Sequence, residues 1–184
     1  QRVESHPSKV LFQDMSQSHS VGWTYEQVQL HLREIAAFFY SKKADNPRVA
    51  MYLNNSIEGA SVDLACLSYD IFDTPLNVHF NAKILAYVFD SLGIEFLVTD
   101  TLERLKVVKE AMDSIGRDIK IVVTVPELEN NKLVDFDLGK ESKQISLKQA
   151  NDILAKRKVK PLNQVATTMF TSGSTGVPKG VSFS

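Results

Sequence analysis

Apolar residues follow two alternating spacings along the chain. Short runs of adjacent apolar residues at 48–53, 96–99 and 119–125 are separated by longer segments in which apolar residues recur every three or four positions. The runs are typical of buried strands, and the longer segments are typical of helices that cover a sheet. The alternation predicts βαβ units, and therefore an α/β fold with a mostly parallel sheet flanked by helices.

Capping and turn residues set the expected limits of these elements. A capping box formed by Thr24 and Gln27 predicts a helix over 25–42, and a second box formed by Ser146 and Gln149 predicts a helix to about residue 156. Gly93 and Gly116 are positioned to end two further helices. The segment 57–69 is apolar on nearly every face, so we expect a buried helix there. Further strands are expected at 9–13, 74–77 and 165–170.

One internal segment departs from this pattern. Residues 127–142 are polar, carry charges of both signs and have no clear period. The segment is predicted to be a surface excursion whose loss would cost little stability. Because the sequence contains no internal repeat and no convincing boundary, residues 1–184 are expected to form a single domain.

Charge and composition exclude several classes of partner. The 21 Lys and Arg residues nearly cancel the 22 Asp and Glu residues, so no general field would hold the chain on nucleic acid or an anionic membrane. No stretch approaches the roughly 20 apolar residues of a transmembrane segment, and the N-terminus lacks a signal-peptide core. We therefore expect a cytoplasmic protein, in which the single Cys66 is a buried and inert thiol.

The strongest candidate for chemistry lies near the end of the chain. The expected strand 165–170 leads into a loop at 171–180, and an extended pattern resumes at Val181 and Phe183. The loop combines three glycines, four hydroxyl side chains and Lys179. Glycines let successive backbone N–H groups approach one anion, hydroxyls add donors, and the ammonium adds a charge-assisted contact. This combination predicts a polyphosphate-binding loop.

Other loop motifs do not fit the spacing. A Walker A loop needs Gly-Lys-Ser/Thr at the start of a helix, whereas here Pro178 precedes Lys179 and a strand follows. A nucleophile elbow at Ser174 would need a glycine at position 172, which is a serine. A flexible hairpin loop without a ligand is the remaining structural alternative.

The segment Thr171–Gly180 resembles the signature loop of the adenylate-forming (AMP-binding) superfamily, which includes acyl-CoA synthetases, luciferases and adenylation domains. Weaker matches precede it in the family's order at 23–28, 48–50, 53–58 and 74–77. The chain departs from the family at Tyr69-Asp70, where Gly-Ala is usual, and His79 matches no motif position and is interpreted as structural. Within the superfamily the chain looks most like the N-terminal part of a long-chain fatty acyl-CoA synthetase.

The resemblance implies a reaction and a role for the loop. A fatty acid carboxylate would attack the α-phosphorus of ATP to give acyl-AMP and pyrophosphate, and CoA would then take the acyl group. The loop would hold the β- and γ-phosphates bridged by Mg²⁺, whose acidic protein ligand in the family lies outside this stretch. The implied phosphate-binding residues are Thr171, Ser172, Gly173, Ser174, Thr175, Gly176 and Lys179.

The resemblance also implies what the chain lacks. The family's adenine-binding segment and its C-terminal domain with the catalytic lysine have no counterpart in this sequence, so the fragment alone is expected to be inactive. Two alternatives remain open. One is an acyl-AMP ligase or adenylation domain that loads a carrier protein, and the other is a non-catalytic nucleotide-binding module.

Overall fold

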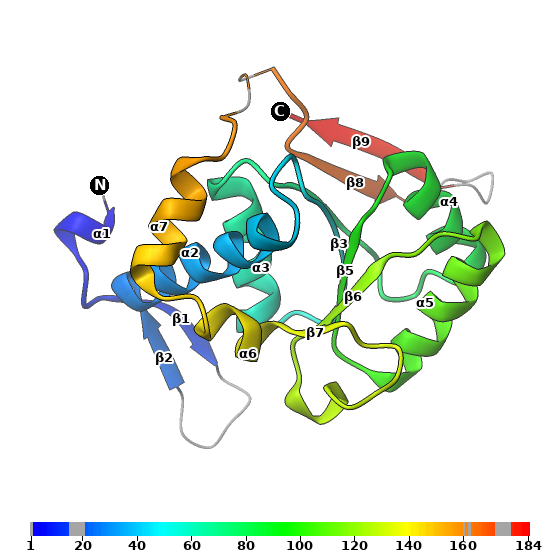
Figure 1. The fold of residues 1–184 in the computed structure, drawn as a ribbon, viewed down its shortest axis with the longest axis horizontal. Helices are drawn as coiled ribbons and strands as arrows, with labels where there is room; N and C mark the ends of the chain where they lie inside the picture. The colour runs from blue at the N-terminus through cyan, green and yellow to red at the C-terminus, as the bar shows by residue number, and fades with distance from the viewer. Residues whose placement is uncertain (1, 15–20, 160, 162, 172–177) are drawn as a thin grey trace.

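The computed structural model describes residues 2–14, 21–159, 161, 163–171 and 178–184. These residues contain a seven-stranded sheet in the order β7-β6-β5-β3-β4-β8-β9, in which only β9 runs antiparallel to its neighbour (Figure 1). The expected α/β fold with a mostly parallel sheet is confirmed. The strands are β3 (Arg48–Tyr52), β4 (Phe72–Pro75), β5 (Phe96–Thr99), β6 (Lys120–Val123), β7 (Phe136–Asp137), β8 (Thr167–Thr171) and β9 (Lys179–Phe183).

Helices cover both faces of this sheet. One face carries α2 (Tyr25–Lys42), α3 (Ile57–Ser68), α6 (Leu138–Lys143) and α7 (Leu147–Ala155), with α2 packed against the other three. The opposite face carries α4 (Ala82–Leu92) and α5 (Leu102–Ile115), which pack against each other (Figure 1). Within the described residues, no helix combines the length and the apolar composition needed to cross a bilayer.

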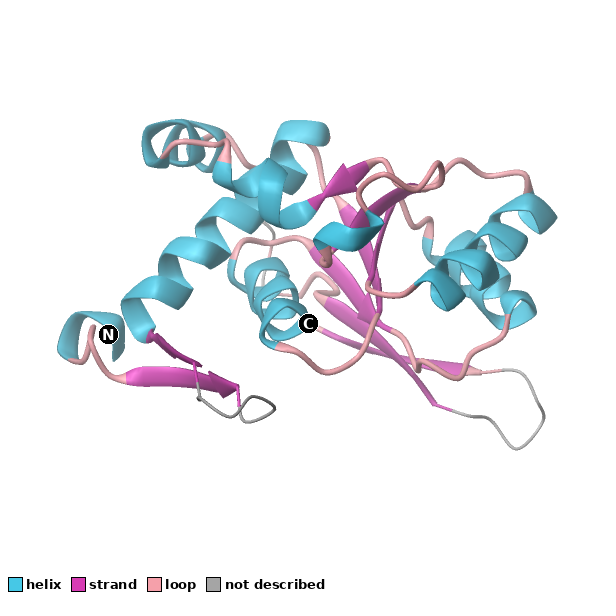
Figure 2. Ribbon diagram, turned by 90° about the horizontal axis from the view of Figure 1, so that it is seen from below, coloured by secondary structure: helices cyan, strands magenta, loops and turns pink. Residues whose placement is uncertain are grey.

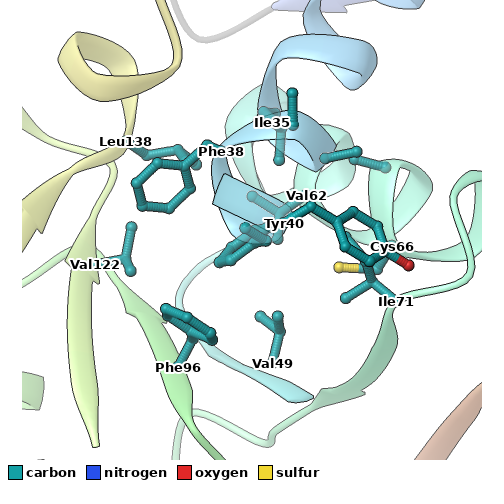
Figure 3. Close-up of a cluster of buried hydrophobic side chains, with 14 of the residues drawn as sticks. Ile35, Phe38, Tyr40, Val49, Val62, Cys66, Ile71, Phe96, Val122 and Leu138 are labelled. Carbon is teal, nitrogen blue, oxygen red and sulfur yellow. The ribbon is translucent and has the colours of Figure 1, made fainter. Parts of the chain in front are cut away.

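Two apolar clusters occupy the two faces. The cluster beneath α2 and α3 includes Phe38 from α2 and Phe96 from β5 (Figure 3). The ring of Phe39 from α2 meets each of these two rings edge to face. Cys66 of α3 is fully buried in the same cluster, as expected for a structural thiol. The second cluster lies beneath α4 and α5 and includes Leu97 and Ile121. The central strands β3, β5 and β6 are therefore shielded from water on both sides, which is typical of parallel sheets.

The capping residues act as the sequence predicts. Thr24 and Ser146 each accept from the backbone of Gln27 and Gln149 in complete capping boxes. Gly93 and Gly116 end α4 and α5 in the left-handed conformation that glycine adopts without strain. The expected burial of α3 is only partly correct, because one side of the helix, including Leu67, is exposed.

The N-terminal segment differs from the prediction. The strand expected at 9–13 is present as β1 (Val10–Asp14), but it pairs antiparallel with β2 (Val21–Thr24) in a separate two-stranded sheet (Figure 2). A four-residue helix, α1 (Arg2–Ser5), precedes it. The strand β2 was missed because Val-Gly-Trp-Thr is too short to display a period and contains a glycine.

The prediction of a surface excursion at 127–142 is wrong. After a short 3-10 turn, η1 (Pro126–Leu128), the segment adds β7 to the edge of the sheet and then forms α6. Leu138 is buried in the cluster under α2, and the ring of Phe136 meets Phe38 edge to face. These elements of two and six residues are too short to produce a period, so their few apolar residues went unrecognised.

Candidate nucleotide-binding site

The two strands that flank the predicted loop form a regular hairpin. β8 and β9 pair antiparallel over five residues on each side, from Thr167 opposite Phe183 to Thr171 opposite Lys179. Since β8 also runs parallel to β4, its last residue lies at the carboxyl edge of the parallel sheet. The structure therefore confirms that the segment joins two strands. In open α/β sheets this edge is where ligands commonly bind.

The hairpin places two of the seven predicted phosphate-binding residues. Thr171 and Lys179 are exposed partners at the open end, where the Thr171 hydroxyl donates to the Lys179 carbonyl at 3.5 Å. Within the described residues, Lys179 has no carboxylate partner. Its ammonium is available to an anion. Ser172, Gly173, Ser174, Thr175 and Gly176 lie outside the described residues.

Gly180 has a steric role in this hairpin. It lies opposite Phe170, and a Cβ at this position would come within 3.1 Å of the Phe170 ring and 3.2 Å of the Thr168 methyl group. Glycine therefore lets the aromatic ring lie over the neighbouring strand next to the loop.

Hydroxyl groups join the hairpin to the rest of the sheet. The Thr74 hydroxyl donates to the Thr168 carbonyl at 2.5 Å, and the hydroxyls of Thr168 and Ser182 lie 2.9 Å apart. Thr74 and Thr168 are both buried. These bonds fix β8 between β4 and β9 at the level just below the loop.

A hollow of about 370 Å³ lies beside the hairpin at the same edge of the sheet. Met51 and Leu53 at the end of β3, Leu76 after β4 and Met169 of β8 give it apolar walls, and Asp63 of α3 adds a carboxylate. Sequence reasoning missed this hollow because its walls come from four separate elements. A larger hollow of about 460 Å³ is lined mainly by α2 and α7 and contains none of the predicted phosphate-binding residues.

Asp73 on β4 was also missed. The residue has no exposed surface, and neither of its carboxylate oxygens has a hydrogen-bond partner among the described residues. Burial raises the pKa of Asp73 to about 8, the neighbouring Asp63 carboxyl adds to the rise, and the Thr167 hydroxyl opposes it. The sequence contained one signal for a buried acid, because Asp73 directly follows the apolar pair Ile71-Phe72. The strand was expected to begin at Thr74, so Asp73 was placed outside it, whereas β4 begins at Phe72.

Polar groups bridge the carboxyl ends of β3 and β5. The chain continues from β3 to α3 on one face of the sheet and from β5 to α5 on the other face. The Asn54 backbone donates to the Asp100 carboxylate at 2.9 Å. Arg104 of α5 donates to the Asn54 side chain at 2.8 Å and also pairs with Asp100. These groups satisfy one another, and the hollow beside the hairpin extends from Met169 of β8 to Asn54 of this bridge.

Comparison with known proteins places this architecture in a family. The profile described as AMP-binding enzyme matches residues 1–184. The chain belongs to the AMP-binding enzyme family. This assignment agrees with the resemblance carried by residues 171–180, which lie within the matched range.

Two curated relatives of this chain carry related names. The chain is 24% identical over 149 residues to long-chain-fatty-acid–CoA ligase 5 of Rattus norvegicus, covering 76% of this chain and 21% of that protein. It is 27% identical over 143 residues to long chain acyl-CoA synthetase 8 of Arabidopsis thaliana, covering 73% and 19%. The chain thus spans about a fifth of the length of these relatives.

Several solved structures share the fold of this chain. A benzoate CoA ligase from Burkholderia xenovorans LB400 superposes with a TM-score of 0.75 at 14% identity, covering 98% of this chain and 32% of that chain. The O-succinylbenzoate Coenzyme A synthetase from Bacillus subtilis, in complex with AMP, gives a TM-score of 0.66 at 18% identity, covering 98% and 40%. At these identities the likeness supports the fold.

Proposed function

We propose that this AMP-binding family member supplies the ATP phosphate-binding loop of a fatty acyl-CoA ligase. The observation that carries the proposal is the β8–β9 hairpin, which sets Thr171 opposite Lys179 at the carboxyl edge of the sheet. A hydroxyl and an ammonium that has no carboxylate partner in the described part of the chain lie at the base of a glycine-rich loop, and they match the donors that a triphosphate requires.

The loop would act on the first chemical step. When a carboxylate attacks the α-phosphorus of ATP, the bond from that phosphorus to the bridging oxygen breaks, and negative charge builds on the departing pyrophosphate. Lys179 would neutralise part of this charge, and the Thr171 hydroxyl would donate to a phosphate oxygen. Ser172, Gly173, Ser174, Thr175 and Gly176 are proposed to complete the cradle with hydroxyl and backbone N–H donors.

Mg²⁺ is proposed to enter this site with ATP, bound to phosphate oxygens. Among the described residues, no three His, Cys, Asp or Glu side chains gather into a group that could hold a metal ion. The ion would supply charge neutralisation between the phosphates. Within the described part of the loop, Thr171 and Lys179 would hold the phosphates in place around it.

The substrate and the acceptor are proposed from the relatives. Both curated relatives are named for long-chain fatty acids or acyl chains and for CoA, which supports a long-chain fatty acid and CoA here. Transfer to a carrier protein is the alternative. Pyrophosphate exchange by the full-length enzyme across fatty and amino acids, followed by thioester formation with CoA or with a carrier, would separate the two. The proposed activity belongs to the whole enzyme, and residues 1–184 alone are expected to form no acyl-AMP.

Substitution of Lys179 tests the role of the loop. Lys179→Ala is expected to weaken ATP binding roughly tenfold or more, because a charge-assisted contact contributes about 1.5–3 kcal/mol. Calorimetric titration with ATP measures this effect, and far-UV circular dichroism checks the fold. Lys106→Ala is the matched control, since Lys106 is an exposed lysine on α5. Equal ATP affinity in the wild type and Lys179→Ala would remove Lys179 from the site.

A further inference from the structure

The joint between β4 and β8 is the narrowest parallel contact on this side of the sheet. β3 pairs with β4 and with β5 over four residues each, whereas β4 and β8 share a single pair, Asp73 opposite Thr167. The Asp73 amide donates to the Ala166 carbonyl at 3.2 Å, and the Thr74 hydroxyl bond to Thr168 lies next to it. The hairpin that carries Thr171 and Lys179 is attached to the parallel sheet through this joint.

The Asp73 side chain lies inside the joint on the face covered by α3. Its register partners are Val49 on β3 and Thr167 on β8, so these three side chains share one face of the sheet. Val49 belongs to the apolar cluster on that face, and the buried Thr167 hydroxyl has no hydrogen-bond partner among the residues that the structure describes. From α3, the Asp63 carboxyl acts on Asp73. Among the described residues, no lysine or arginine pairs with either carboxylate.

Two carboxylates in this arrangement cannot both be ionised at low cost. Each ionised group only accepts hydrogen bonds, and water is excluded from Asp73. A single proton resolves the conflict, because a protonated Asp73 can donate to Asp63. The raised pKa of Asp73, about 8, has the direction that this arrangement requires.

We propose that Asp63 and Asp73 share one proton, and that this proton fixes the β4–β8 joint from which the phosphate-binding hairpin extends. Asp73 is then a positioning residue that acts on the loop through β8. Without the proton, a negative charge would occupy the dry joint next to a second carboxylate and weaken the attachment of β8. The consequence for ATP rests on the proposed function, whereas the shared proton and the joint do not.

The first test measures the joint without nucleotide. In protein labelled with ¹³C at the Asp carboxyl carbon, Asp73 should titrate near pH 8. Amide exchange at Asp73, corrected for the intrinsic rate, should lose up to about tenfold in protection per pH unit between pH 6 and 8 and then level off. Protection should fall in this way because Asp73 holds its proton in the closed joint below pH 8 and loses it when the joint opens.

Three variants test whether the pH dependence comes from the shared proton or from a general loosening of the protein. Asp73→Asn keeps a donor toward Asp63 and should make the protection of residue 73 independent of pH. Asp63→Asn offers a donor to Asp73, so the Asp73 titration should move down by at least about one pH unit. Asp152→Asn, an exposed carboxylate on α7, is the matched control and should keep the wild-type profile.

A final measurement connects the joint to the loop. The wild type should bind ATP several-fold more weakly than Asp73→Asn at pH 9, and equally well at pH 6.5. A loop that binds no ATP at any pH would defeat the proposed function and leave the carboxyl titration standing. An Asp73 titration near pH 4, or the same pH dependence of protection in Asp73→Asn and the wild type, would overturn the shared proton.

Discussion

The centre of the sheet and its β8–β9 side are built from the same kind of element but are held in different ways. In β3, β5 and β6 nearly every residue is buried, and each neighbouring pair is in register over four residues. All five residues of β9 are exposed, and β8 meets β4 at one register pair. The centre is stabilised by apolar packing over many residues, whereas the hairpin depends on a few polar groups.

The strands that contribute most to stability are therefore different from the strands that carry the proposed binding residues. Most of the buried side chains in the central strands are apolar. The β4–β8 joint instead uses Asp73, Thr74, Thr167 and Thr168, all buried polar residues, directly below the predicted loop. Binding residues on a mobile or weakly attached element of a rigid scaffold are a common arrangement.

The largest expected effect compares one phenylalanine from each region. Phe39→Ala should lower the free energy of unfolding by about 3–5 kcal/mol, because the fully buried ring contacts Phe38 and Phe96 and its removal leaves a cavity. Phe183→Ala on β9 removes a half-exposed ring and should cost about 1 kcal/mol or less. Urea unfolding with a constant m-value measures both changes. Equal losses in the two variants would contradict the contrast between the regions.

Local signals in the sequence were sufficient for the central region. The helix 25–42 and the strand 96–99 appear with the expected limits, and α5 ends at Gly116 as expected. The helices combine apolar spacing with a cap or a stop residue, and the strand is an uninterrupted apolar run. The position of the loop between two strands was equally predictable, since β8 is a strand-like run and residue 178 is a proline. In these elements local preference and tertiary packing agree.

Other features depend on contacts that a linear pattern does not contain. Strand β7 becomes recognisable only through its pairing with β6, and Leu138 becomes a core residue only because α2 covers it. The pairing of β1 with β2 is likewise a tertiary outcome. Asp73 is the clearest case, because its pKa is raised first by burial and then by Asp63, and is lowered by Thr167. Asp63 lies 10 residues before Asp73 in the sequence, and Thr167 lies 94 residues after it. Fold class could be predicted from the chain, but this part of the candidate site could not.

The second-largest expected effect is a pH dependence of the free energy of unfolding, which arises from Asp73 on the β4–β8 side of the sheet. The pKa of Asp73 is raised in the folded state to about 8, whereas the unfolded chain has an ordinary value near 4. The stabilising contribution is therefore fully present below about pH 4 and is lost as the pH rises to about 8. The expected loss is on the order of 1 kcal/mol per pH unit, reaching about 2–4 kcal/mol between pH 5 and 8.

Urea unfolding of the wild type and Asp73→Asn at pH 5, 6, 7 and 8 measures this contribution. The wild type should lose stability across the series, while the variant should change much less and be the more stable protein at pH 8. Asp152→Asn should follow the wild type, because that carboxylate is exposed. Parallel profiles for the wild type and Asp73→Asn would show that the buried carboxyl does not control the pH dependence.

The smallest expected effect concerns two glycines that face different surroundings. At Gly180 an added methyl would meet the Phe170 ring and the Thr168 methyl group at 3.1–3.2 Å, so Gly180→Ala should displace the ring and cost about 1 kcal/mol. At Gly139 in α6 the nearest atom is the Asp137 carboxylate at 3.5 Å, an ordinary contact. Gly139→Ala should therefore stabilise the protein by about 0.5–1 kcal/mol through helix propensity. Thermal unfolding of both variants gives the two signs directly, and a stabilising Gly180→Ala would mean that the hairpin adjusts freely and that Phe170 does not fix its shape.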